Sequence, residues 1–261
     1  INFKPDAALI LLHPKSTIMP QNTTNWLALM QFDSYHHVRT DVNKDYLRIL
    51  RYIRGKAVGI VLSGGGTRGW AHLGAIKALR ERKIPIDMIG GTSVGAIIAG
   101  CYAMHESWED AYDRFHTIIK ESATAVSWRS LTWPAISLFN AKGFTLSLMQ
   151  VFKNVKIENL WLPYFCITSN LASNTEAVHR SGLLWQKTRA SAAIPGIIPP
   201  MILDNEIHLD GGLLNNLPVD IARSFLGKRA RIIAVDLNSF AHDSHKYIFP
   251  PILTFKQTLF A

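Results

Sequence analysis

AVGIVLSGGGTRG, residues 57–69, and IDMIGGTSVGAIIAG, residues 86–100, are the two stretches of the sequence that decide its fold. Each begins with an apolar run of strand length, turns at a cluster of glycines and continues into a segment with helical spacing. Parallel strands need a long crossover between them, and a helix is the usual one. Two such units in succession therefore predict a parallel sheet with helices packed against it.

The alternation of strands and helices continues along the chain. Further strands are predicted over 164–168, 177–180, 206–209 and 231–237, and helices over 67–82, 94–104, 185–193 and 218–225. Ahead of them we expect a short buried strand over 7–12 and a helix from Asp41 to Ile53. The whole pattern predicts an α/β fold, a three-layer sandwich around a mainly parallel sheet.

The length and the start of the chain indicate how it is organised. Its 261 residues leave room for one substantial core. We expect an N-terminal extension over residues 1–55, a main domain over 56–240 and a C-terminal tail over 241–261. The chain starts at Ile1 with neither an initiator Met nor an apolar leader, so we expect it to be a fragment of a longer protein.

The composition is basic, with a formal net charge of +9 and a pI near 9.6. Such a surface attracts nucleic acid or anionic lipid. No helix-turn-helix, zinc-finger or RNA-binding signature occurs, so we expect no nucleic-acid partner. Contact with lipid and plain solvation of surface lysines and arginines both stay open. The longest apolar run, Met88 to Met104, is shorter than the ~20 residues that a membrane-spanning helix needs.

The two cysteines, Cys101 and Cys166, each lie within an apolar run. We expect buried structural thiols rather than a disulfide or zinc ligands. Free thiols fit a reducing compartment, and with the basic charge they lead us to expect a cytoplasmic, membrane-associated protein. The sequence does not indicate an oligomeric state.

The stretch 122–143 is unusually rich in aromatic residues. They are Trp128, Trp133, Phe139 and, just beyond the stretch, Phe144. Two interpretations are open, a capping insert packed on the core and a lid that contacts lipid, because amphipathic aromatic side chains favour the membrane interface.

The pair His36 and His37 has acidic residues nearby but no recognised spacing of metal ligands. A surface or hydrogen-bonding role is therefore favoured over a metal site.

The turn Gly91-Thr92-Ser93-Val94-Gly95 matches the pattern G-x-S-x-G between an apolar strand and an apolar helix. A sharp strand-to-helix turn requires small residues beside the serine and lets its hydroxyl project from the sheet. The positive end of the following helix dipole lies close to that hydroxyl. This context predicts a nucleophilic serine, Ser93, rather than a mere tight turn.

The other glycine cluster, Gly64, Gly65 and Gly66, allows several interpretations. With Gly69 it satisfies G-x-G-x-x-G, which is typical of dinucleotide-binding oxidoreductases. That function needs an acidic residue at the far end of the next strand, where Asp87 does not stand. A Walker-type loop fails too, because no lysine follows. The free N–H groups at a helix start, with Arg68 nearby, instead predict a cradle for an oxyanion or a lipid phosphate.

A nucleophilic serine needs a base, and the best candidate is Asp210. It ends a predicted strand and precedes Gly211-Gly212, which allow the backbone to turn sharply beside the site. A histidine should follow the acid in a conventional triad, but only His242 and His245 do so, in the polar tail. A carboxylate is a weak base in water, so Asp210 must be partly desolvated to act.

Taken together, these motifs resemble the patatin-like phospholipase family, and within it the branch of neuropathy target esterase and its bacterial relatives. The resemblance covers about residues 56–237 and extends weakly to His36–Arg39. Its motifs, in chain order, are Gly64–Gly69 with His72, Gly91–Gly95, Arg189–Pro195, Asp210–Gly212 and Asn215–Pro218.

The resemblance implies a catalytic dyad in which Ser93 is the nucleophile and Asp210 the base. It also implies an oxyanion hole formed by the N–H groups of Gly64 to Gly66, with Arg68 in support. The expected substrates are acyl esters of phospholipids and lysophospholipids, and no metal or organic cofactor is expected. A catalytically inactive lipid-binding scaffold and, less favoured, a nucleotide-binding oxidoreductase are the alternatives.

Overall fold

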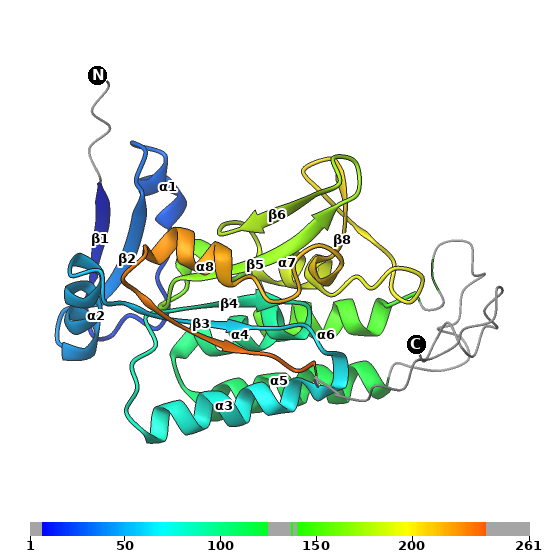
Figure 1. Ribbon diagram of the computed structural model, residues 1–261, viewed down its shortest axis with the longest axis horizontal. Helices are drawn as coiled ribbons and strands as arrows, with labels where there is room; N and C mark the ends of the chain where they lie inside the picture. Colours follow the sequence, from blue (N-terminus) through cyan, green and yellow to red (C-terminus); the bar gives the residue numbers. More distant parts are fainter. Residues whose placement is uncertain (1–6, 125–136, 138–139, 239–261) are drawn as a thin grey trace.

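The central element of the fold is a seven-stranded sheet with helices on both faces (Figure 1). The structure, a computed structural model, describes residues 7–124, 137 and 140–238. Four neighbouring strands are parallel, in the order β9 (Arg231–Val235), β3 (Val58–Leu62), β4 (Met88–Thr92) and β5 (Tyr164–Asn170). Three strands joined through antiparallel pairings complete the sheet: β6 (Thr175–His179), β7 (Met201–Leu203) and β8 (Glu206–Asp210).

Each face of the sheet has its own apolar core. On one face lie α3 (Trp70–Glu81), α4 (Val94–His105), α5 (Trp108–Thr124), α6 (Lys142–Phe152) and α7 (Leu184–Ser191). On the other face α8 (Val219–Leu226) packs against the sheet through Ala222 and Leu226 (Figure 1). The predicted three-layer sandwich around a mainly parallel sheet is confirmed.

The apolar run from Met88 to Met104 divides into β4 and α4. Val94 to Met104 are all buried, so α4 is apolar on every side because other elements surround it. No helix among the described residues has the length and apolar character to cross a membrane. Cys101 and Cys166 are free and buried in this core, as expected, and burial raises the pKa of Cys166 to about 12.

Strand β5 fixes how two other strands meet. Its residues 166 and 167 pair with β4 on one side and with β6 on the other, and residues 168–170 pair with β6 and β8. Strands β4 and β8 therefore share one edge of β5, end to end. Because β4 is parallel to β5 and β8 is antiparallel, the carboxyl ends of β4 and β8 face each other, at Thr92 and Asp210.

The N-terminal extension forms a small unit at the end of the sheet where β4 begins (Figure 1). It contains β1 (Ala8–His13), α1 (Thr23–Leu27), β2 (Ser34–Arg39) and α2 (Asn43–Ile53), and β1 and β2 pair in parallel. The predicted strand over 7–12 exists, but the prediction that it is buried is wrong. Its side chains alternate in exposure, with Leu12 62% exposed, because the described part of the chain leaves one face of this two-stranded sheet uncovered.

Strand β2, which periodicity did not predict, carries His36 and His37. Both are buried, so the expected surface position is wrong, whereas the hydrogen-bonding role of His37 is confirmed. The two ring nitrogens of His37 bond to His13 and to the carbonyl oxygen of Glu158, each at 2.9 Å.

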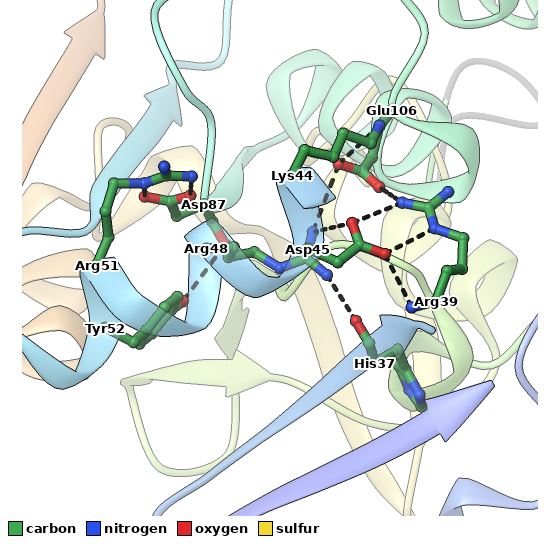
Figure 2. Close-up of polar contacts among 9 residues, drawn as sticks. All are labelled: His37, Arg39, Lys44, Asp45, Arg48, Arg51, Tyr52, Asp87 and Glu106. Atoms are coloured by element: carbon green, nitrogen blue, oxygen red, sulfur yellow. Dashed lines mark hydrogen bonds and ion pairs between the residues drawn. The ribbon is translucent and has the colours of Figure 1, made fainter. Parts of the chain in front are cut away.

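Buried ion pairs attach this unit to the main domain (Figure 2). Arg39 lies 2.7 Å from a carboxylate oxygen of Asp45 and 2.6 Å from one of Glu106, at the end of α4. From α2, Arg51 bonds to both carboxylate oxygens of Asp87, at 2.8 and 2.6 Å. The side chains of Asp45 and Asp87 are fully buried, so these charges depend on their partners.

Some element boundaries differ from the prediction. The segment predicted as one helix over 67–82 is a 3₁₀ helix, η1 (Gly66–Gly69), followed by α3. Helices α5 and α6 were not predicted. Of the aromatic residues around 122–143, Trp128, Trp133 and Phe139 lie outside the described residues, whereas Phe144 packs partly buried against the main core.

The Arg39 pairs yield a stability prediction. Arg39→Ala should lower the free energy of unfolding by about 3 kcal/mol or more, because Asp45 and Glu106 lose a buried partner. The control Lys15→Ala removes a pair with Asp41 in which both side chains are exposed, and should cost under about 1 kcal/mol. Urea denaturation measures both, and similar small losses would show that the buried network contributes little.

Candidate active site

Ser93 occupies a strained turn between β4 and α4. Its φ and ψ are 54° and −126°, a conformation that costs a non-glycine residue on the order of 1–3 kcal/mol. A Cβ at Gly91 or Gly95 would collide with the backbone carbonyl oxygen of Leu62. The requirement for small residues on both sides of the serine is therefore a consequence of how closely this turn passes the end of β3.

Ser191, at the end of α7, holds the turn in place. Its hydroxyl accepts a hydrogen bond from the Ser93 N–H at 2.9 Å and donates one to the carbonyl oxygen of Ile167 at 2.6 Å. The strained backbone of Ser93 is thus tied to β5. Sequence reasoning placed Ser191 in a family motif, Arg189–Pro195, but gave it no role.

Asp210 lies where β8 meets β4, and its side chain lines the same pocket as Ser93. The Gly212 N–H donates a hydrogen bond to Oδ1 at 2.7 Å. Burial raises the pKa of Asp210 above its usual value, and the Gly212 N–H and the nearby Ser93 side chain only partly oppose that rise. The arrangement places a desolvated carboxylate beside a serine.

The glycine loop stands beside this pair, but its three N–H groups differ. The Gly64 N–H donates to the carbonyl oxygen of Asn216 at 3.2 Å, so it is already used. The N–H groups of Gly65 and Gly66 donate to no acceptor among the described residues. Gly66 has a φ of 56°, in the left-handed region that favours glycine.

Arg68 lies behind the loop and touches neither Ser93 nor Asp210. Its backbone N–H and its Nε both donate to the carbonyl oxygen of Gly65, at 3.2 and 3.3 Å. The C=O and N–H of one planar peptide point to opposite sides. Holding the Gly65 oxygen therefore also fixes the direction of the Gly66 N–H.

A pocket of about 280 Å³ joins these groups. The residues that line it are Gly64, Gly65, Gly66, Ser93, Ile194, Pro195, Asp210, Gly212, Leu213 and Asn216. The structure thus brings together five of the six residues predicted for the site, and places Arg68 outside the pocket. Among the described residues that line it, Asp210 alone is an acid or a base near neutral pH. Among the described residues, no group of three or more His, Cys, Asp or Glu could hold a metal ion.

The described histidines near the site are committed to other partners. His72 is buried and its Nε2 lies 2.8 Å from the carbonyl oxygen of Ser63, the residue before the glycine loop. The Nδ1 of His208 and the Nε2 of His179 both bond to the Thr168 hydroxyl, at 2.8 and 2.7 Å. Histidines 242 and 245 lie outside the described residues.

Asp87 does not take the place of a ribose-binding acid. It precedes β4, whereas the glycine loop follows β3, and the two strands are parallel, so the two features lie at opposite edges of the sheet. Its carboxylate is occupied by Arg51 and by the Val58 N–H. The G-x-G-x-x-G pattern in this chain is therefore not part of a dinucleotide site.

Comparison with known proteins identifies the family. The family model described as Patatin-like phospholipase matches residues 60–223. Patatin-like phospholipase domain-containing protein 6 of Homo sapiens is 35% identical over 260 residues, which are 88% of this chain and 19% of that protein. Lysophospholipase NTE1 of Kluyveromyces lactis is 41% identical over 183 residues, 68% of this chain and 12% of that protein.

The chain spans about a fifth of the length of the first of these relatives, so the comparison concerns one domain of a larger protein. The order of the motifs, the fold and the matched residues all agree with one another. The chain belongs to the patatin-like phospholipase family, in the branch of neuropathy target esterase.

Proposed function

We propose that this chain is a serine hydrolase that cleaves acyl esters of lysophospholipids and phospholipids. The observation that carries the proposal is a single pocket that Ser93, the buried carboxylate of Asp210 and the glycine loop line together. The similarity to a lysophospholipase, that of Kluyveromyces lactis, supports the lipid substrate.

In the proposed reaction, Asp210 accepts the Ser93 proton while Oγ attacks the ester carbonyl. The oxyanion of the tetrahedral intermediate receives hydrogen bonds from the N–H groups of Gly65 and Gly66. The intermediate collapses as Asp210 returns its proton to the departing alcohol, which leaves an acyl ester on Ser93. Water, deprotonated by Asp210, then releases the fatty acid and restores the serine.

The Gly64 N–H contributes less to the oxyanion hole than the family resemblance implied, because the carbonyl oxygen of Asn216 already accepts its hydrogen bond. We assign Gly64 a steric role. A Cβ there would collide with the Asn216 side chain and approach the Cβ of Ser93 to 3.2 Å. Arg68 is a positioning residue that orients the Gly66 N–H through the Gly65 oxygen.

We also propose peripheral contact with a membrane around the pocket mouth. Leu213 lines the pocket and Leu214 follows it, and they are 55% and 46% exposed; Ile194, another lining residue, is 37% exposed. Apolar side chains around a pocket can enter the interfacial layer, and the net charge of +9 favours anionic lipid. The association would be reversible, at a cytoplasmic membrane surface.

The dyad predicts a characteristic set of mutant rates. Ser93→Ala and Asp210→Asn should each lower ester hydrolysis by about 10³-fold or more, with little further loss in the double mutant, because the two residues act as a unit. His208→Ala should keep most of the activity. Hydrolysis of lysophosphatidylcholine by purified proteins measures this, with circular dichroism to confirm folding. A folded His208→Ala protein as inactive as Ser93→Ala would replace the dyad with a triad.

The oxyanion loop yields a second prediction. Gly66→Val should lower kcat by about 10²-fold, because a β-branched residue disfavours positive φ and turns the N–H away. The matched control is Gly74→Val on α3, since neither Gly66 nor Gly74 has an atom within 4 Å of an added Cβ. The control should keep most of its turnover. Normal turnover in a folded Gly66→Val protein would remove the loop from the mechanism.

Membrane contact predicts a difference between two substrates. Leu214→Asp should lower hydrolysis of lysophospholipid in anionic vesicles by about tenfold, because an inserted leucine contributes ~1.5–3 kcal/mol. Hydrolysis of a short soluble ester should not change. Leu29→Asp, at an exposed leucine of the N-terminal extension, serves as the control and should affect neither substrate. Equal rates on vesicles for wild type and Leu214→Asp would contradict contact at the mouth.

A further inference from the structure

A second pocket, of about 240 Å³, lies between α2 and the segment that joins α3 to β4. Five of its lining residues are cationic and two are acidic: Lys44, Arg48, Arg51, Arg80 and Lys83, with Asp87 and Glu106. The lining side chains therefore carry an excess of three positive charges, from five cations and two carboxylates. The remaining lining residues are Leu47, Pro85 and Ile86.

The two carboxylates of this basic pocket are already neutralised (Figure 2). Asp87 is bound by Arg51 through two hydrogen bonds. Glu106 accepts from Arg39 at 2.6 Å and also lies 3.4 Å from Arg48 and 3.5 Å from Lys44.

The cations at the rim have no such partner. Arg80, on the last turn of α3, and Lys83, just after it, are exposed and form no ion pair with any described carboxylate. Another lining residue, Arg48, is 2% exposed, and its Nε–H has no acceptor among the residues that the structure describes. Positive charge thus converges on a concave site that lacks the anions to balance it.

We propose that the basic pocket binds a phosphate monoester, with Arg80 and Lys83 as its principal donors. A monoester carries nearly two negative charges at neutral pH, and the arginine fork matches two phosphate oxygens. The pocket volume of about 240 Å³ is of the size that suits a small phosphorylated group. The phosphate group could belong to a soluble ester or to the headgroup of a lipid.

The position of the pocket connects it to Ser93 through two elements. Asp87 precedes β4 and Ser93 follows it, while Ser93 precedes α4 and Glu106 ends it. A five-residue strand and a twelve-residue helix each span about 17 Å, so the basic pocket is roughly that far from the serine. It is a site separate from the active-site pocket, at the junction with the N-terminal extension.

The test compares binding by two charge-matched double variants. Arg80→Gln/Lys83→Gln removes the proposed donors, and Arg82→Gln/Lys120→Gln removes two exposed cations that do not line the pocket. Titration calorimetry with glycerol 3-phosphate measures the soluble source. Co-sedimentation with vesicles of ether-linked phosphatidate in phosphatidylcholine measures the lipid source, because ether chains cannot be hydrolysed.

We expect saturable binding in at least one arm, weakened about tenfold or more in Arg80→Gln/Lys83→Gln and unchanged in the control, with affinity falling as NaCl rises. Binding in the calorimetric arm assigns a soluble ester, and binding to vesicles alone assigns a lipid headgroup. No binding in either arm overturns the proposal. Binding that both double variants lose equally, or that neither loses, also overturns it. These results do not depend on whether Ser93 is catalytic.

Discussion

The meeting of Ser93 and Asp210 in one pocket depends on two strands that share one edge of β5 and approach each other from opposite directions. β4 delivers Ser93 at its carboxyl end, and β8 delivers Asp210 at its own, so the pairs Thr92–Ile167 and Asp210–Thr168 are consecutive along β5. A shift of one residue in either register would turn a side chain to the other face of the sheet. Other parts of the fold serve to hold this junction: Ser191 ties the Ser93 backbone to β5, and the Ser169 hydroxyl donates to the Asp210 carbonyl oxygen.

Burial suits Asp210 to the proposed role of base, and it has a cost in stability. Its pKa is raised in the folded protein, so the native state binds more protons than the unfolded chain over the interval between the two pKa values. Stability therefore falls as the pH rises through that interval, and at neutral pH the charged carboxylate lowers the free energy of unfolding. The strained φ of Ser93 adds a second cost at the same place. Two unfavourable features in one pocket are typical of a site shaped by chemistry rather than by folding.

The two strand–turn–helix units were predictable because their information is local. Each unit consists of an apolar run, a turn rich in glycine and the residue after that turn, all within a few positions of one another. These residues specify β3, β4, the glycine loop and Ser93. The sequence also singled out Asp210, because a strand followed by two glycines marks a turn. The residue pattern made Asp210 the best candidate for the base of Ser93, and the family resemblance implied a dyad of the two.

What escaped prediction depends on contacts between distant parts of the chain. Ser191 lies 98 residues after Ser93 in the sequence, and Asn216, whose carbonyl oxygen accepts the Gly64 N–H, lies more than 150 residues after Gly64. Neither role therefore leaves a local pattern in the sequence. Burial of β1 was overestimated because an apolar run does not reveal how many faces are covered. Helices α5 and α6 were not predicted for a related reason, because the core that they pack against is formed by distant parts of the chain.

The claim that a buried Asp210 activates Ser93 is tested most directly by the rate at which a fluorophosphonate probe labels Ser93 as a function of pH. The account predicts covalent labelling at Ser93 whose rate falls as the pH drops through the raised pKa of Asp210, because the protonated carboxyl cannot accept the serine proton. Asp210→Asn should label about 10³-fold more slowly, without that acid limb. Labelling of folded Asp210→Asn at the wild-type rate, with the same pH dependence, would contradict the account.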